Sequence, residues 1–87
     1  MINLEKKIKI LVVDDSDLIL NLFREIFGDN FEVITCVDGL EGIQKAAEYK
    51  PDIIFLDLMM PNLDGIKMLQ VKKVLKDIQD IPVIVMS

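Results

Sequence analysis

Short apolar runs alternate with longer amphipathic stretches along most of this chain. Four runs have the length and composition of strands, at residues 8–13, 31–36, 53–56 and 81–86. Three intervening stretches repeat apolar residues every three or four positions, as helices do when one face packs against a core. Alternation of helices with continuously apolar strands is typical of a parallel sheet covered on both faces, so the pattern predicts an α/β fold.

Each expected helix carries residues that favour its ends. Ser16 or Asp17 can cap the first helix, and Gly28 stands where a glycine often follows one. Asp38 and the glutamate three residues later form a capping box for the second helix, and Asp64 is expected to cap the third. The apolar positions expected to face the core are Ile19, Leu22, Phe23, Ile26 and Phe27, then Leu40, Ile43, Ala46 and Ala47, then Ile66, Leu69, Val71 and Val74.

Three aspartates follow two of the expected strands. Asp14 and Asp15 end the first apolar run, Asp57 ends the third, and Ser87 follows the fourth. The carboxyl ends of parallel strands share one edge of the sheet, which is where open α/β sheets bind ligands. Like charges about 4 Å apart repel by several kcal/mol even at an effective dielectric constant near 20, so such a cluster needs a divalent cation or bound protons.

Oxygen ligands of this kind suit a hard cation. Mg²⁺ prefers oxygen donors, keeps several waters and is usually shared with a phosphate group. A carboxylate can also attack phosphorus and form an acyl phosphate, while the metal neutralises the charge on the transferring oxygens. One carboxylate must attack while the others hold the metal, and Asp57, alone on its strand, is the natural nucleophile.

Composition excludes several other functions. The net charge of −5 argues against nucleic-acid binding by this segment, and Lys72, Lys73 and Lys76 are interpreted as the solvated face of a helix. No apolar run approaches the length of a transmembrane helix and no signal peptide precedes the first strand, so no membrane association is expected. Cys36 is the single cysteine and is expected to be a small buried hydrophobe, which fits a reducing cytoplasm. The chain has no histidine, which makes zinc a poor candidate and rules out a histidine-activated nucleophile.

Three segments closely resemble the receiver domain of two-component response regulators. They are Asp14-Asp15-Ser16, the nine residues from Asp57 to Gly65 (DLMMPNLDG), and the run 81–87. The resemblance extends from residue 8 to the end of the chain. It implies a CheY-like (flavodoxin-like) fold with helices on both faces of the sheet and strand order 2-1-3-4 in the part that is present.

The resemblance also implies roles for individual residues. Asp57 would be the phosphoacceptor, and Asp14 and Asp15 would be the acidic pair that binds Mg²⁺ or Mn²⁺. Met59 would give its backbone carbonyl to the metal, and the Ser87 hydroxyl would contact the phosphoryl group. The partner would be a sensor histidine kinase or a phosphotransfer protein, and the segment would not be an independent enzyme.

Family members continue with a further helix, strand and helix after the position that matches Ser87. The expected domain, residues 1–87, is therefore a receiver truncated after its fourth strand, without the family's fifth-strand lysine. Two functions follow: a phosphoacceptor module in two-component signal transduction, or a remnant that is not phosphorylated and acts as an oligomerising scaffold. In either case an unpaired edge on the fourth strand would favour a homo-oligomer.

Overall fold

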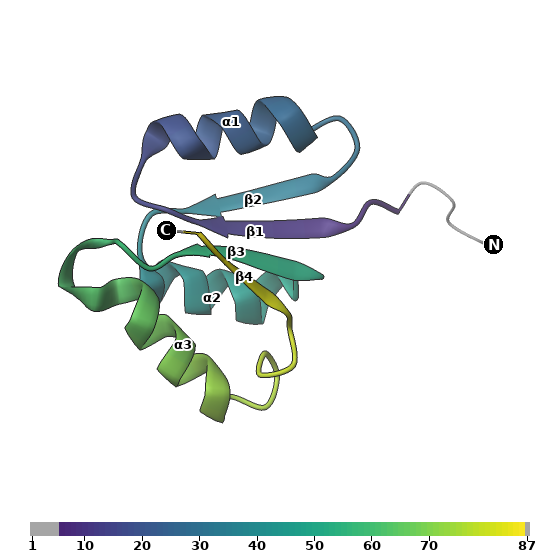
Figure 1. Cartoon of the computed structure of the whole chain (residues 1–87). Coiled ribbons are helices and arrows are strands. Elements are labelled where there is room, and N and C mark those ends of the chain that lie inside the picture. Colours follow the sequence, from purple (N-terminus) through teal and green to yellow (C-terminus); the bar gives the residue numbers. More distant parts are fainter. Residues whose placement is uncertain (1–5, 87) are drawn as a thin grey trace.

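A single parallel sheet with helices on both faces forms the fold in the computed structural model, which describes residues 6–86 (Figure 1). The strands are β1 (Lys9–Val13), β2 (Glu32–Cys36), β3 (Ile53–Asp57) and β4 (Val83–Met86), in the order β2-β1-β3-β4. The helices are α1 (Asp17–Phe27), α2 (Gly39–Tyr49) and α3 (Asp64–Val74), and a short 3₁₀ helix, η1 (Pro61–Leu63), precedes α3. The expected α/β class, four strands, three helices and strand order are all confirmed.

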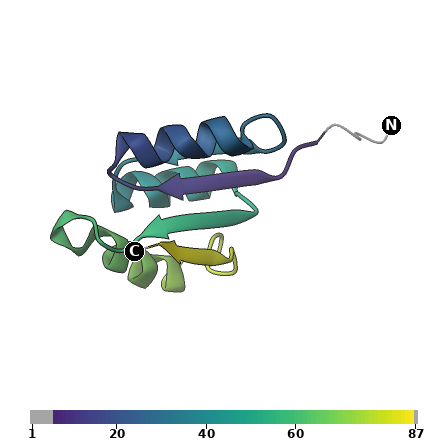
Figure 2. The same ribbon diagram turned by 45° about the horizontal axis from the view of Figure 1, so that its top comes forward.

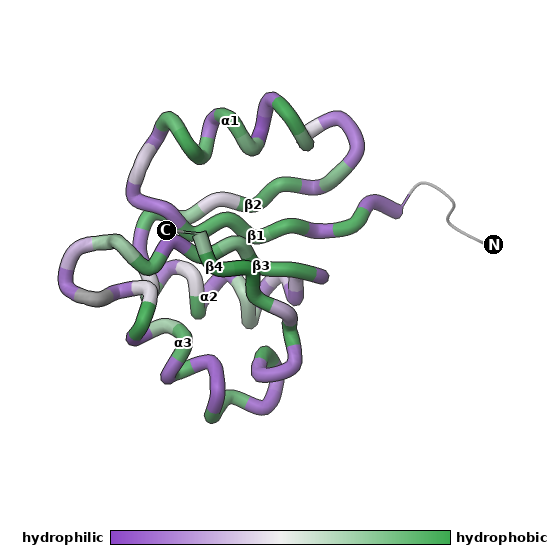
Figure 3. The backbone as a smooth tube through the Cα atoms, in the orientation of Figure 1, coloured by the Kyte–Doolittle hydropathy of each residue, from purple (hydrophilic) through white to green (hydrophobic). Residues whose placement is uncertain are grey.

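The sheet separates two apolar clusters, with α1 on one face and α2 and α3 on the other (Figures 1 and 2). Alternate strand residues point to opposite faces, so Ile10 and Val12 pack beneath α1 while Leu11 and Val13 pack beneath α2 and α3. Both faces of β1 are therefore buried, β3 is buried on one face and partly buried on the other, and these strands are almost continuously hydrophobic (Figure 3). Burial on both faces is the physical reason for the apolar runs in the sequence.

The two ends of α1 differ in detail from the expected caps. Ser16 is the N-cap, and its hydroxyl accepts a hydrogen bond from the N–H of Ile19. Asp17 is the first helical residue, so it does not cap the helix. Gly28 follows the helix as expected, but its φ of −63° is right-handed, so the position does not require glycine for its backbone conformation.

The buried stripe of α1 agrees with the expected one only in part, since Ile19, Phe23 and Phe27 are partly buried. Leu20 is buried, with Phe23 packing beside it, whereas Leu22 and Ile26 are exposed. The rings of Phe23 and of Phe55 on β3 lie 5.0 Å apart, which ties α1 to the middle of the sheet. The stripe that contains Leu20 and Phe23 therefore faces the sheet.

The inner face of α2 is made of small residues. Gly39, Gly42 and Ala46 are buried, while Leu40, which the periodicity placed inside, is 71% exposed, and Ala47 is also exposed. The capping prediction is correct here, since the Asp38 carboxylate accepts a hydrogen bond of 2.8 Å from the Glu41 N–H. Small residues let α2 lie close to its neighbours, and larger ones at these positions would hold it away.

The orientation of α3 was also predicted incorrectly. Its buried residues are Gly65, Met68 and Lys72, whereas Ile66, Val71 and Val74 are exposed. Lys72 is only 7% exposed, and its ammonium donates a 2.9 Å hydrogen bond to the carbonyl of Gln79, so it is not part of a solvated face. Burial lowers the pKa of Lys72. Asp64 does not cap α3, because the chain enters this helix directly from η1.

β4 pairs only with β3 among the described residues. The sequence predicts an interior strand that is apolar on both faces, yet Ile84 and Val85 are 46% and 48% exposed. Ile84 pairs with Phe55 and Val85 with Leu56, so the two exposed side chains lie on opposite faces. The unpaired edge expected on the fourth strand is therefore present within residues 6–86.

Cys36 is buried as expected, at 1% exposure. Burial raises the pKa of its thiol to about 12, so it behaves as a small hydrophobe rather than as a nucleophile. Within residues 6–86, no helix has the length and hydrophobicity needed to cross a membrane.

Lys50 provides a test of the backbone at the end of α2. It is the C-cap and adopts a left-handed conformation, with φ of 48° and ψ of 63°. A side chain costs about 1–2 kcal/mol in this conformation, whereas glycine has no Cβ to clash. We therefore expect Lys50→Gly to stabilise the protein by about 0.5–1 kcal/mol in urea unfolding, after the entropy that glycine loses on folding.

Lys50→Ala is the matched control. It removes the same charge and the exposed 3.9 Å pair with Asp77, but it keeps the Cβ atom. Alanine should give no gain in stability. An equal gain in both variants would mean that the charge, and not the backbone, limits stability at this position.

Candidate metal and phosphoryl site

Three carboxylates meet at the carboxyl end of the sheet. Asp14 and Asp15 follow β1 and Asp57 ends β3, and one oxygen of each lies within 4.8 Å of the others. The register produces this meeting, since Val13 pairs with Leu56 and the next residue on each strand is an aspartate. The proximity expected from the sequence is therefore present.

Asp14 is the buried member of the cluster, at 5% exposure. Its Oδ1 accepts a 2.8 Å hydrogen bond from the N–H of Ser16, and its own N–H donates to the carbonyl of Cys36. Burial raises the pKa of Asp14, and the nearby negative charges of Asp57 and Asp15 raise it further, against the opposing effect of the Ser16 N–H. A divalent cation at this position would relieve both the desolvation of Asp14 and its repulsion by its neighbours.

Asp57 is half-buried, and the loop after it is anchored at several points. The N–H of Met59 donates a 2.8 Å hydrogen bond to Asp57 Oδ1, which fixes one oxygen of the carboxylate. The side chain of Met60 is buried in the core beside α2 and α3, while that of Met59 is exposed. Gly65 lies against the carbonyl of Asp57, and a Cβ atom there would lie 2.9 Å from the Cα of Leu58. The loop that follows the candidate nucleophile is thus held by the core and by α3.

The expected phosphoryl contact of Ser87 and the expected metal contact of the Met59 carbonyl stay predictions. Ser87 lies outside the described residues. Its neighbour Met86 accepts a hydrogen bond of 3.2 Å from the Leu58 N–H, which aligns the end of β4 with the loop after Asp57. For Met59 the structure gives the N–H bond to Asp57, and the role of its carbonyl remains a prediction.

The sequence reasoning missed the part that two residues play in the site, the donor Ser16 and the anchor Met60, while Gly65 was expected only as a turn residue that holds the loop beside Asp57. The motif that includes Met60 and Gly65 was recognised, but their contacts depend on the tertiary fold and leave no pattern in the sequence.

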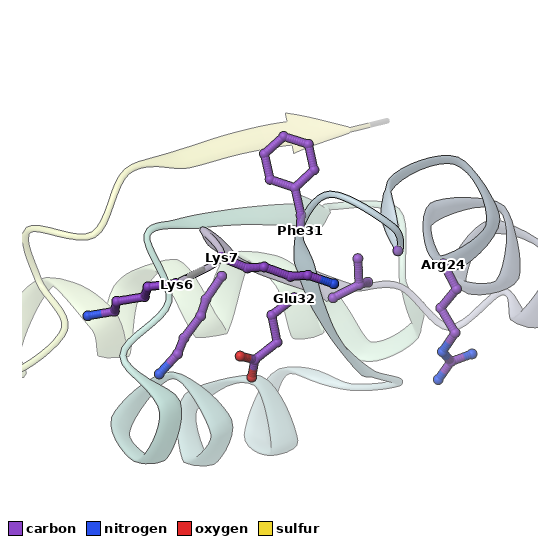
Figure 4. Close-up of a pocket in the computed structure, with 8 residues that line it drawn as sticks. Lys6, Lys7, Arg24, Phe31 and Glu32 are labelled. Carbon is purple, nitrogen blue, oxygen red and sulfur yellow. The ribbon is translucent and has the colours of Figure 1, made fainter. Parts of the chain in front are cut away.

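A basic cavity lies at the opposite end of the sheet (Figure 4). It has a volume of about 580 Å³ and is lined by four cations, Lys6, Lys7, Lys9 and Arg24. Lys6 extends away from Arg24, and the two lie on opposite sides of the view (Figure 4), while Arg24 donates hydrogen bonds to Asn21 and Thr35. The cations therefore do not converge on one point, and the acidic cluster is the better candidate for a site with defined chemistry.

Comparison with known proteins identifies the family. The model of the response regulator receiver domain matches residues 10–87, which is most of the chain. The chain belongs to this family. Receiver domains are regulatory modules of two-component systems and interact with histidine kinases or phosphotransfer proteins.

Curated relatives contain this segment within longer proteins. The chain is 42% identical over 80 residues to the transcriptional regulatory protein PrrA of Mycobacterium tuberculosis, which covers 91% of the chain and 34% of the relative. It is 45% identical over 85 residues to a protein-glutamate methylesterase/protein-glutamine glutaminase of Clostridium acetobutylicum, covering 94% and 24% respectively. The chain thus spans about a third or less of the length of these relatives.

Solved structures agree with the fold. The N-terminal domain of a response regulator receiver protein from Methanoculleus marisnigri matches with a TM-score of 0.85 at 34% identity, covering 91% of this chain and 65% of that one. The receiver domain of the sensor histidine kinase PA1611 from Pseudomonas aeruginosa also gives a TM-score of 0.85, at 20% identity, covering 94% and 68%. A magnesium ion is coordinated in the active-site cleft of the latter structure.

The raised pKa of Asp14 predicts how stability depends on pH without metal. Between its ordinary value of 3.8 and its raised native value, the native state binds more protons than the unfolded state. The free energy of unfolding should therefore fall as pH rises through this window, and the whole loss of stability remains at pH 7. Asn at this position can still accept the bond from Ser16 but carries no charge, so Asp14→Asn should unfold at higher urea than the wild type at pH 7 in EDTA.

The difference between Asp14→Asn and the wild type should close below pH 3.8, where the wild-type carboxyl is protonated. Asp17→Asn is the control, because Asp17 lies in the first turn of α1 and outside the cluster. That change should lower stability slightly at pH 7, since a negative charge favours a helix N-terminus. An Asp14→Asn variant less stable than the wild type in EDTA at pH 7 would contradict the assignment of Asp14 as a destabilising buried charge.

Proposed function

We propose that this receiver accepts a phosphoryl group on Asp57 from the phosphohistidine of a sensor histidine kinase or phosphotransfer protein. The observation that carries the proposal is the meeting of three carboxylates, with Asp57 on its own strand and held in place by the Met59 N–H. A carboxylate oxygen of Asp57 would attack phosphorus as the P–N bond of the donor breaks, leaving the electron pair on the imidazole nitrogen. The same cluster favours this function over that of a scaffold that is never phosphorylated.

The remaining oxygens of the cluster fit a divalent cation. Asp15, Asp57 and the Met59 carbonyl would hold Mg²⁺ or Mn²⁺, with Asp14 acting mainly through water and the Ser87 hydroxyl contacting the phosphoryl group. The bound cation would neutralise negative charge on the phosphoryl oxygens during transfer. The residues of the chain orient the nucleophile: Met59 fixes one Asp57 oxygen, which leaves the other to attack.

Exposed apolar side chains surround the candidate site and suit a protein partner. Leu18 follows the β1 loop, Leu40 follows the β2 loop and Met59 lies in the β3 loop, and all three are largely exposed. A phosphodonor on a helix with an apolar face could cover these side chains while its phosphohistidine reaches Asp57. We propose that this exchange takes place in the cytoplasm, where the single thiol of Cys36 would stay reduced.

Phosphorylation should be seen directly by intact mass. Acetyl phosphate with Mg²⁺ should add one phosphoryl group to the 87-residue chain, and EDTA should prevent the addition. Asp57→Asn should abolish it, because an amide oxygen cannot form the acyl phosphate. Asp17→Asn is the matched control and should be labelled like the wild type, since Asp17 lies at the same edge but outside the cluster. Labelling of Asp57→Asn at the wild-type rate would show that another residue is the nucleophile.

We further propose that the 87-residue chain, when studied alone, self-associates through the edge of β4. Its unpaired N–H and C=O groups and the exposed Ile84 and Val85 offer a second copy both strand pairing and apolar contact. Burial of this apolar surface would favour association, against the translational and rotational freedom that the two copies lose.

Sedimentation at micromolar concentration should therefore show a dimer or a larger oligomer. Ile84→Lys should shift the protein toward the monomer, because it places a charge on the proposed interface. Leu40 on α2 is more exposed than Ile84 and lies away from β4, so Leu40→Lys should leave the oligomer intact. A folded wild-type monomer whose β4 amides resist hydrogen exchange would refute the interface.

A further inference from the structure

Gly39 at the start of α2 touches the backbone at the start of α3. A Cβ atom at Gly39 would lie 2.5 Å from the carbonyl oxygen of Asp64 and 3.2 Å from its carbonyl carbon. Real Cβ atoms essentially never approach backbone atoms this closely, so any side chain at position 39 would have to displace α2 or α3. The helices reach this distance only because residue 39 has no side chain.

The next residue of α3 makes a second backbone contact of this kind. Gly65 lies so close to the carbonyl oxygen of Asp57 that an added Cβ would collide with it, and the Cα of Leu58 would be 2.9 Å away. Of the two residues that open α3, Asp64 therefore contacts α2 at Gly39, and Gly65 contacts the end of β3 at Asp57. Backbone atoms, which cannot change rotamer, form both contacts.

This arrangement fixes both ends of the loop that follows the candidate nucleophile. The loop leaves Asp57 at the end of β3 and returns to α3 at Asp64, and Met60 in the core anchors its middle. Met59, whose N–H is bonded to Asp57 Oδ1, lies between these anchors. Its position relative to the Asp57 carboxylate therefore depends on where the first turn of α3 lies.

The start and the inner face of α2 are held in place. Its start is held by the Asp38 cap, with the N–H groups of Glu41 and Gly42 bonded to the Asp38 side chain and carbonyl at 2.8 and 3.0 Å. Its inner face packs on β1, since a Cβ atom at Gly42 would already lie 3.1 Å from the side chain of Val13. A side chain at position 39 would thus push mainly against Asp64 and the loop.

We propose that Gly39 is a positioning residue for the phosphoryl and metal site, acting through Asp64 on the loop that holds Met59 against Asp57. This inference rests on the proposed function for its effect on metal binding, but its structural effect can be measured without metal. Although Gly39 does not touch the carboxylates, a methyl group at this position should disturb them.

Gly39→Ala and Gly42→Ala form a matched pair one turn apart on α2. A Cβ atom at Gly42 would meet two side chains, the flexible Met68 with its sulfur at 2.8 Å and Val13 at 3.1 Å, and not the backbone of the loop. Both variants should lose stability. Only Gly39→Ala should move the Met59 amide signal in metal-free spectra and weaken the binding of Mg²⁺, added alone, by about tenfold or more, as loss of groups that orient metal ligands typically does.

The outcomes separate this inference from the proposed function. An unchanged Met59 amide signal in metal-free Gly39→Ala, or an equal change in Gly42→Ala, overturns the inference even if Asp57 is phosphorylated normally. If the wild type binds no Mg²⁺ and is not labelled on Asp57, the proposed function fails, while the metal-free comparison still decides the role of Gly39.

A wild-type experiment covers the case in which Gly39→Ala does not fold. As Mg²⁺ is added to the wild type, the amide signals of Gly39 and Asp64 should shift together with that of Met59, because the contacts link them. If the Met59 signal moves while those of Gly39 and Asp64 remain unchanged, the inference is overturned.

Discussion

The parallel pairing of β1 with β3 is the contact on which the rest of this structure depends. Its register sets Val13 beside Leu56 and so places the next residues, Asp14 and Asp57, side by side at the edge of the sheet. β1 is buried on both faces and β3 on the face beneath α2 and α3, and Leu11 and Ile54 have no exposed surface, so neither strand can slide without exposing core residues. Burial of apolar surface therefore holds together carboxylates that repel each other, and the pKa of Asp14 is raised, first by its own burial and then by the charges of Asp57 and Asp15.

The strands and the acidic edge could be predicted from the sequence because their cause is local. A strand buried on both faces must be apolar throughout, and a carboxylate that directly follows it must emerge at the edge. Asp14, Asp15 and Asp57 could be placed at the same edge on this basis, while the strand order that makes them neighbours came from the family resemblance. The chemical roles of these residues are still predictions, and Ser87 lies outside the described residues.

The helix faces could not be predicted in the same way, because each depends on which neighbour covers it. Leu40 fits the apolar period of α2 yet is exposed, since the close approach of α3 requires the small residues Gly39 and Gly42 on the inner side. The charge of Lys72 led to the prediction that it is solvated, but its ammonium donates a hydrogen bond to the Gln79 carbonyl beyond the end of α3. Glycine contacts and buried lysines have no periodic signature, and they became visible only in three dimensions.

Charge is distributed unevenly between the two ends of the sheet, for a reason that lies in the topology. The helices run opposite to the strands, so residues that open helices lie at the carboxyl end, where helix N-termini favour acids. The described charged residues at that end are Asp14, Asp15, Asp17, Asp38, Glu41, Asp57 and Asp64, with Lys45 and Lys67. Those at the other end are Glu25, Asp29, Glu32, Glu48, Asp52, Asp77 and Asp80, with Lys6, Lys7, Lys9, Arg24, Lys50, Lys72, Lys73 and Lys76.

The two signs nearly balance at the amino end, so the negative field is concentrated at the acidic site and attracts cations there. The same field repels an anionic phosphodonor, which makes a bound cation a condition for the proposed transfer as well as an aid to it.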